Sequence, residues 1–249
     1  MPDAVGIIPA RFASVRLPGK ALAVIAGLPM IQHVHQRASE ARLLSRVVVA
    51  TDDERILEAV VGFGGQALMT AASHASGTDR VAEAARLLNL KDDTLVVNIQ
   101  GDEPLLAPAA IDELVQGLAE APEVPMATLA HAATEKEPFH DPSVVKVVFD
   151  TRGRALYFSR APIPANRSAH PRPTYYKHLG IYAYRHSFLQ QLTSLPPSPL
   201  EAAEKLEQLR VLEHGFHIRV ITTSYDSIGV DTPEDLARVR ALLAGDSTI

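Results

Sequence analysis

The chain has 249 residues, of which 47% are hydrophobic and 21% are charged, and its formal net charge is −5. This balance indicates a globular protein with a substantial core, and the acidic charge argues against a nucleic-acid-binding protein, which is usually basic. Cysteine is absent, which excludes disulfides and thiolate sites, and since neither a signal-peptide pattern nor a membrane-length apolar run is present we expect a cytoplasmic protein.

In the first half of the chain, short apolar runs alternate with helical patterns. Apolar and β-branched runs predict strands over residues 4–8, 46–50, 66–69 and 95–99. Apolar spacing and capping residues predict helices over residues 30–43, from a cap within 51–54 through Val61, from a cap at Thr78 or Asp79 onward, and over residues 108–118. This alternation predicts an α/β fold with a mostly parallel central sheet and helices on both faces.

The middle of the chain has a different pattern, with strand-like runs that no long helix separates. We expect strands over residues 124–130, 144–149, 155–158 and 180–184, a hairpin turn at 151–154 and an exposed, proline-rich loop over 162–173. We interpret residues 124–185 as an added β-rich lobe within a single domain that spans residues 1–249. Two helices follow, over residues 199–214 and from Thr232 onward.

The most informative segment is the loop that follows the first strand. It contains Arg11, Ser14, Arg16, Gly19 and Lys20. Three cations so close together suit the oxygens of a phosphate chain, and a glycine lets the backbone approach them. The loop has neither the Walker A pattern nor the dinucleotide-binding glycine pattern. A solvated basic loop remains the alternative.

Two aspartates stand at positions suited to a metal ion. Asp102 follows the predicted strand 95–99, at the carboxyl end where open α/β sheets bind ligands, and Asp231 precedes the last helix. Mg²⁺ is commonly held by one or two carboxylates together with substrate phosphates. Small residues before the helix near Arg80, including Gly77, leave room for a nucleotide base. Each position also has a purely structural interpretation as a helix cap or turn residue.

Taken together, these segments resemble the 3-deoxy-manno-octulosonate (Kdo) cytidylyltransferases, also called CMP-Kdo synthetases. The resemblance covers nearly the whole chain and is most specific in Phe158-Ser159-Arg160, His178-Leu179-Gly180-Ile181-Tyr182 and Glu207-Gln208-Leu209-Arg210. It implies a Rossmann-like nucleotidyltransferase fold, Mg²⁺ as cofactor, and a homodimer formed largely through the middle lobe. It further implies that CTP and Kdo react to give CMP-Kdo and pyrophosphate for lipopolysaccharide assembly.

The resemblance also assigns roles to individual residues. Catalytic roles fall to Arg11, Arg16, Lys20 and Asp102, and nucleotide binding to Arg11, Ser14, Lys20, Gly77 and Arg80. Sugar binding falls to Gln100, Arg160, His178, Tyr182, Glu207 and Gln208, and metal binding to Asp102 and Asp231. For three of these residues a structural role remains open: His178 as a strand histidine, Arg160 in a salt bridge, and Glu207 in a surface pair with Arg210.

Two other functions remain possible from the sequence. One is a cytidylyltransferase for another acidic sugar, such as a sialic acid or the 8-amino analogue of Kdo. The other is a nucleotide-binding protein without turnover, which would not need two metal carboxylates beside Lys20.

Overall fold

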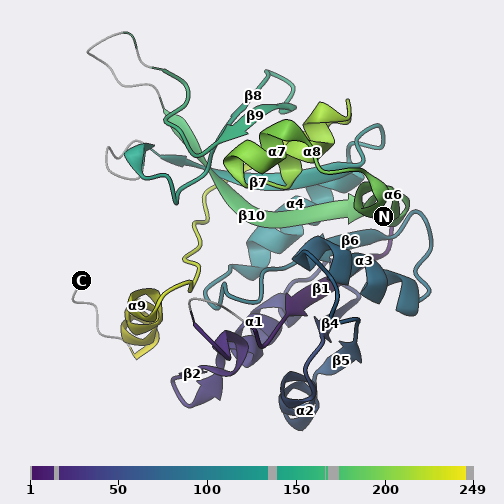
Figure 1. Cartoon of the computed structure of the whole chain (residues 1–249), viewed down its shortest axis with the longest axis vertical. Helices are drawn as coiled ribbons and strands as arrows, with labels where there is room; N and C mark the ends of the chain where they lie inside the picture. The colour runs from purple at the N-terminus through teal and green to yellow at the C-terminus, as the bar shows by residue number, and fades with distance from the viewer. Residues whose placement is uncertain (1, 14–16, 134–138, 166, 168–173, 245–249) are drawn as a thin grey trace.

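A computed structural model gives the fold of all residues except 1, 14–16, 134–138, 166, 168–173 and 245–249. Its centre is a nine-stranded sheet (Figure 1). The strands are β1 (Ala4–Ala10), β2 (Val24–Ile25), β3 (Leu28–Pro29), β4 (Arg46–Thr51), β5 (Gln66–Met69), β6 (Leu95–Asn98), β7 (Met126–Ala133), β8 (Lys146–Phe149), β9 (Ala155–Ser159), β10 (Tyr175–Arg185) and β11 (Ile218–Thr223). Strands β2 and β3 form a separate small hairpin.

The main path of the sheet runs β11-β7-β10-β6-β1-β4-β5. Strands β1, β4, β5 and β6 are parallel to one another, as are β7 and β11, whereas β10 is antiparallel to β6, β7 and β8. In the middle of the parallel part, Ile7 of β1 is paired with Val48 on one side and with Asn98 on the other. The predicted mostly parallel sheet is therefore confirmed.

Helices pack against both faces of this sheet. They are α1 (Met30–Ser39), α2 (Glu54–Gly62), α3 (Gly77–Leu87), α4 (Pro108–Ala119), α6 (His186–Ser194), α7 (Pro199–Glu204), α8 (Gln208–Glu213) and α9 (Pro233–Ala244), with a single 3₁₀ turn, η1, at Lys20–Leu22. Side chains of α1, α2 and α4 form one core cluster with the sheet, and those of α3, α6 and α8 form another.

Strand β1 contributes to both clusters because successive residues of a strand point to opposite faces. Val5 and Ile7 pack under α3, whereas Ala4 and Ile8 pack on the side of α1 and α4. The near-continuous apolar composition of this strand follows from burial on both faces.

The middle of the chain is β-rich as predicted, and two of its strands, β7 and β10, run within the central sheet itself. The other two, β8 and β9, pair with each other and branch from β10 where Lys177 is paired with Lys146. Strand β10 is longer than the predicted 180–184 and shifts register between Leu179 and Tyr182. Of the predicted loop 162–173, Pro162, Pro164, Ala165 and Arg167 are exposed, and 166 and 168–173 lie outside the described residues.

Two predicted helices were too long. The helix predicted over 30–43 ends at Ser39, because the amide of Leu43 donates to Asp112 Oδ1 of α4 (2.9 Å) instead of continuing the helical ladder. The helix predicted over 199–214 is two helices, α7 and α8, separated at Lys205, whose φ of 54° is incompatible with a continuous helix.

The helix caps largely follow the sequence pattern. Asp53 caps α2, and Thr232 precedes α9 as predicted. The predicted cap of α3, Thr78 or Asp79, was wrong: Ser76 is the cap, and Asp79 instead closes a capping box at the third helical position. Helix α6 and strand β11 were not predicted.

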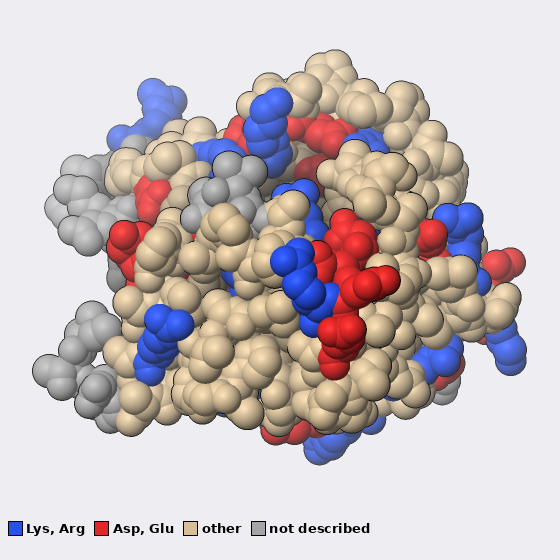
Figure 2. Space-filling view, turned by 60° about the horizontal axis from the view of Figure 1, so that its bottom comes forward, with Lys and Arg blue, Asp and Glu red and all other residues tan. Residues whose placement is uncertain are grey.

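The last helix lies apart from the main layers (Figure 1). It packs against the β2–β3 hairpin, where Leu236, Val239 and Val230 form a small cluster with Ile25 and Met30. On the face shown in Figure 2, groups of Lys and Arg adjoin groups of Asp and Glu. Within the described part of the chain, no helix is both long and apolar enough to cross a membrane.

Candidate active site

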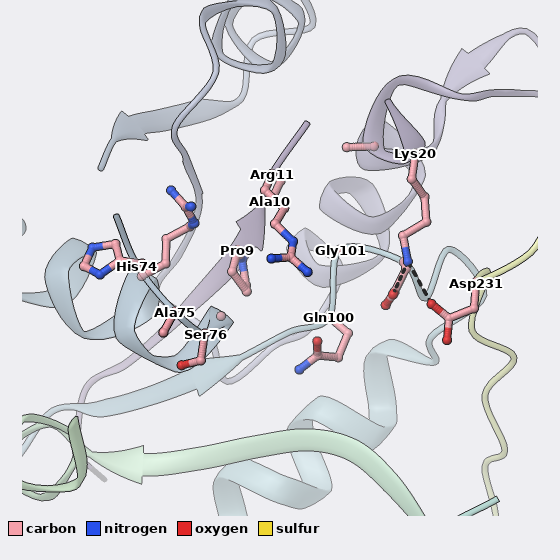
Figure 3. Close-up of a pocket in the computed structure, with 14 residues that line it drawn as sticks. Pro9, Ala10, Arg11, Lys20, His74, Ala75, Ser76, Gln100, Gly101 and Asp231 are labelled. Carbon is pink, nitrogen blue, oxygen red and sulfur yellow. Dashed lines mark hydrogen bonds and ion pairs between the residues drawn. The ribbon is translucent and has the colours of Figure 1, made fainter. Parts of the chain in front are cut away.

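A cavity of about 470 Å³ lies at the carboxyl ends of β1 and β6 (Figure 3), where ligands bind in open α/β sheets. Its wall consists of Pro9, Ala10, Arg11, Lys20, Ala21, His74, Ala75, Ser76, Gly77, Arg80, Gln100, Gly101, Asp102 and Asp231. A side-chain carbon on Gly101 would lie 2.9 Å from the carbonyl oxygen of Pro9. Glycine therefore allows the two strand ends to approach this closely.

Lys20 and two carboxylates form one side of the cavity. Lys20 Nζ lies 2.6 Å from Asp102 Oδ2 and 3.1 Å from Asp231 Oδ1, as the dashed lines in Figure 3 mark. The Lys20 side chain is 16% exposed and that of Asp231 is 49% exposed, so the cluster opens to solvent beside Asp231. The structure thus brings together three residues that the sequence predicted for one site.

The remaining basic residues of the first loop are only partly described. Arg11 follows β1, and in Figure 3 its side chain points into the space between Pro9 and Gly101. Gly19 has a φ of 69° and its amide donates to the carbonyl of Phe12, which folds the loop back so that Lys20 faces the cavity. Ser14 and Arg16 lie outside the described residues, and their phosphate contacts stay predictions.

The N-terminus of α3 forms the opposite side of the cavity. Ser76, its cap, and Gly77, its first residue, both line the wall. The Ser76 hydroxyl bonds to Asp79, and the Asp79 carboxylate accepts the amide of Ser76. This capping box fixes a loop of small residues against the cavity.

Arg80 lines the same wall, but its guanidinium is held by protein groups. It is 4% exposed, Nη1 donates to Thr70 Oγ1 (2.6 Å), and Nη2 donates to Asp52 Oδ2 (2.7 Å). The side chain is therefore a fixed, pre-oriented element of the wall.

Sequence reasoning missed His74, which also lines the cavity. Its Nε2 is hydrogen-bonded to Glu83 Oε2 of α3, and this bond is the main reason that the pKa of Glu83 is lowered. The signal available was a histidine two residues before the Ser76 cap with an acidic residue on the following helix. From sequence alone, a single histidine in a loop does not indicate a site, because only the folded structure shows that it pairs with Glu83.

Comparison with known proteins identifies the family to which this geometry belongs. A family model described as "Cytidylyltransferase" matches residues 5–221. The 3-deoxy-manno-octulosonate cytidylyltransferase of Syntrophobacter fumaroxidans (strain DSM 10017 / MPOB) is 57% identical over 98% of this chain and 98% of its own length. That of Syntrophus aciditrophicus (strain SB) is 54% identical, with 98% and 99% covered. This chain belongs to the 3-deoxy-manno-octulosonate cytidylyltransferase family.

Solved structures agree with this assignment. A CMP:2-keto-3-deoxy-manno-octonic acid synthetase complexed with CTP has a TM-score of 0.92 at 48% identity, with 98% of this chain and 99% of that chain covered. A cytidylyltransferase from Leptospira borgpetersenii serovar Hardjo-bovis (strain JB197) has a TM-score of 0.66 at 18% identity, over 98% of this chain and 88% of its own, and shares the fold. The cytidylyltransferase fold predicted from the sequence is confirmed.

Of the residues expected to bind the sugar, Gln100 after β6 is the one that lines the described cavity wall. The others lie just after β9 (Arg160), on β10 (His178 and Tyr182) and at the start of α8 (Glu207 and Gln208). Gln100 Nε2 donates to the carbonyl of Gly180 (3.0 Å) where β10 shifts register. Glu103, which follows Asp102, accepts a hydrogen bond from the Ser227 hydroxyl (2.8 Å). Burial, and then the Asp102 charge, raise the pKa of Glu103 to about 7.

His178 is a buried, neutral histidine. Its Nε2 lies 3.0 Å from Thr128 Oγ1, and its ring meets those of Phe158 and Tyr182. Thr128 Oγ1 also lies 2.8 Å from the carbonyl oxygen of Ile181 and 3.2 Å from that of Leu179. Because a carbonyl can only accept, the single hydroxyl proton is used there, and His178 Nε2 is assigned as the donor to Thr128. Burial lowers the pKa of His178 to about 3. It can therefore meet a ligand as a neutral hydrogen-bonding group and not as a cation.

Tyr182, Glu207 and Gln208 lie near the N-terminus of α3 and the start of α8. Burial raises the pKa of the Tyr182 hydroxyl well above its usual value. Burial also raises the pKa of Glu207, although hydrogen bonds from Thr78 and Ser76 oppose this. Glu207 thus ties α8 to the capped loop of the cavity. Gln208 is 5% exposed, and its Nε2 finds no hydrogen-bond partner among the described residues.

Arg160, at the end of β9, is oriented by backbone carbonyls and by Glu204. Its Nε donates to the carbonyl of Glu204 (2.8 Å), its Nη1 donates to that of Pro142 (3.0 Å), and its amide donates to Glu204 Oε2 (2.9 Å). The buried ammonium of Lys146 holds the Arg160 carbonyl from the other side at 2.6 Å. This network fixes Arg160 beside the end of α7, where the chain turns toward α8.

Proposed function

We propose that this enzyme transfers the cytidylyl group of CTP to Kdo, giving CMP-Kdo and pyrophosphate for lipopolysaccharide synthesis. The observation that carries the proposal is the cluster of Lys20, Asp102 and Asp231 in a cavity at the strand ends, in a chain of this family. A sugar hydroxyl attacks the α-phosphorus of CTP, its oxygen forms the new P–O bond, and the bond to the β-phosphate oxygen breaks. Pyrophosphate leaves with the electron pair of that bond, and the hydroxyl proton goes to solvent.

The chain's own residues bind and orient the two substrates. Arg11 and Lys20 neutralise the phosphate oxygens, and Ser14 and Arg16 complete this group. Gly77 and the fixed Arg80 form the wall against which the cytosine and ribose lie. Since catalysis of this kind is mostly positioning and charge stabilisation, no covalent enzyme intermediate is needed.

Asp102 and Asp231 have the chemistry of a Mg²⁺ site that substrate phosphates complete. Among the described residues no group of three or more acidic, His or Cys side chains could hold a metal ion. Two carboxylates beside this cavity fit Mg²⁺, which usually takes one or two carboxylates together with phosphates and waters. When bound there, the ion supplies charge neutralisation and polarises the phosphate oxygens.

The sugar would lie between Gln100, α8 and the end of β9. Arg160 is the candidate partner for the Kdo carboxylate, and neutral His178 is a hydrogen-bonding neighbour. Tyr182, Glu207 and Gln208 would contact hydroxyls. Gln208 Nε2, which has no hydrogen-bond partner within the described part of the chain, is a donor that a bound hydroxyl can satisfy. A homodimer and a cytoplasmic location remain predictions from the sequence.

Pyrophosphate release tests the proposal. The purified enzyme is given CTP and Mg²⁺ with Kdo, 8-amino-Kdo or a sialic acid, and each mixture is repeated with EDTA. We expect rapid release with Kdo and Mg²⁺ and none with EDTA. Faster release with another acidic sugar would reassign the substrate, and no release with any sugar would refute the transferase function.

A further inference from the structure

The linker between β11 and α9 carries Asp231 to the cavity. Residues 225–231 belong to no helix or strand, and in Figure 1 the linker runs as an extended yellow segment from the sheet to α9. A segment without its own hydrogen-bond ladder depends on tertiary contacts for its position. The contacts that hold this linker therefore decide where the Asp231 carboxylate lies.

The linker is fastened to the loop that carries Asp102. The Ser227 hydroxyl donates to Glu103 Oε2 at 2.8 Å, and the amide of Val230 donates to the carbonyl of Asp102 at 2.8 Å. Ser227 is 8% exposed and Val230 is fully buried, so both contacts are shielded from water. The short loop after β6 thus carries Asp102 and also holds the linker that carries Asp231.

Further contacts hold both sides of this segment. Lys177 Nζ of β10 lies 2.7 Å from Asp226 Oδ1 and 3.2 Å from the carbonyl of Ser227. At the end of the linker, the amide of Asp231 donates to Asp235 Oδ2 in the first turn of α9. Only a few residues between these anchors remain to adjust the Asp231 side chain.

We propose that Glu103, through its hydrogen bond with Ser227, is a positioning residue that sets the place of Asp231 relative to Asp102. This inference rests on the proposed function, in which Asp102 and Asp231 bind the Mg²⁺ used in cytidylyl transfer from CTP. Glu103 follows Asp102 in the chain, so one loop provides one carboxylate and anchors the linker that provides the other. Breaking this bond leaves Lys177 to hold the stretch from Ser227 to Val230 at its Ser227 end, and this loosens the spacing of the pair.

The test uses Ser227→Ala, which removes one hydroxyl and changes no charge. A shift in Mg²⁺ dependence then reports the position of Asp231 and not the local charge. Ser194→Ala is the matched control, because its hydroxyl also makes one hydrogen bond, to the carbonyl of Gln191, on the remote helix α6. Both variants and the wild type are examined by hydrogen–deuterium exchange and by pyrophosphate release at varied Mg²⁺.

We expect Ser227→Ala to speed exchange at residues 224–232 and to raise the half-saturating Mg²⁺ concentration by about tenfold or more, as for other residues that orient metal ligands. The KM for Kdo should stay near that of the wild type, and Ser194→Ala should change neither reading. Glu103→Gln, which keeps an acceptor oxygen, should retain more protection of the linker than Glu103→Ala.

The outcomes separate the inference from the proposed function. Unchanged exchange in Ser227→Ala would show that the bond does not hold the linker, and unchanged Mg²⁺ dependence with faster exchange would show that it does not position Asp231. Either result overturns the inference. If the wild type released no pyrophosphate, the proposed function would fail, and the positioning role in catalysis would fail with it, whereas exchange would still show whether the bond holds the linker.

Discussion

Replacing Asp102 by asparagine separates the chemistry of the cavity from the stability of the fold. Asparagine has nearly the same shape, so it removes a negative charge and a metal ligand but little core volume. The backbone carbonyl of residue 102 still accepts the amide of Val230. We therefore expect a folded protein that has lost turnover.

The structure indicates how large the effects of Asp102→Asn on stability and on turnover should be. The Asp102 side chain is 28% exposed, and Lys20 retains its second partner, Asp231, at 3.1 Å. Loss of one partly exposed ion pair costs up to about 1 kcal/mol, which corresponds to a fall in Tm of about 2–4 °C for a chain of this size. Loss of a group that stabilises charge in the transition state should cost at least about 10³-fold in kcat, or about 4 kcal/mol.

The assay measures pyrophosphate release and a thermal melt on the same preparation. Asp112→Asn is the matched control, because Asp112 is a 13% exposed carboxylate that accepts the Leu43 amide outside the cavity. It should retain turnover. Asp102→Asn with a normal Mg²⁺-dependent rate would refute the metal assignment, and a large drop in Tm would show that Asp102 is structural.

Three further perturbations test other parts of the site. Lys20→Met should raise the KM for CTP by at least about tenfold, since it removes a charge-assisted contact to phosphate, and initial rates at varied CTP will show whether it does. Glu204→Ala should raise the KM for Kdo by about tenfold and leave that for CTP nearly unchanged, because the Glu204 carboxylate holds the Arg160 amide and the Ser159 hydroxyl and so fixes the backbone that carries Arg160; equal changes in both KM values would contradict this. Because the pKa of His178 is lowered to about 3, its contribution to stability is present above pH 6.5 and is lost as pH falls toward 3. Urea denaturation at pH 7 and 4.5 should therefore show a smaller loss of stability in His178→Gln than in the wild type.

The sequence predicted the parallel half of the sheet well because those strands carry strong local signals. The β-branched run at Arg46–Thr51 can be recognised without any knowledge of its neighbours. The pairing of β7 with β11, in contrast, joins residues far apart in the chain, such as Met126 and Ile218, and local patterns do not specify it. The break between α7 and α8 at Lys205 was missed for a related reason, since a lysine in the sequence does not indicate a positive φ.

The predicted site divides in the same way. Arg11, Lys20, Asp102 and Asp231 were found because the ends of strands and helices are visible in sequence, and all four line one cavity. The protein partners that orient the site could not be predicted. The bond between Glu103 and Ser227 joins segments 124 residues apart, and only the folded chain brings them together.

Lys20 links the resting structure to the reaction. Two carboxylates that share one ammonium form a cluster in which each charge has a partner. A nucleotide that arrives with its cation brings a new partner for both kinds of group, since the cation suits the carboxylates and the phosphates suit the ammonium. We expect this exchange to avoid leaving a charge unpaired in a partly buried site, where an unpaired charge is costly. On this reasoning, CTP and Mg²⁺ should each bind more tightly in the presence of the other.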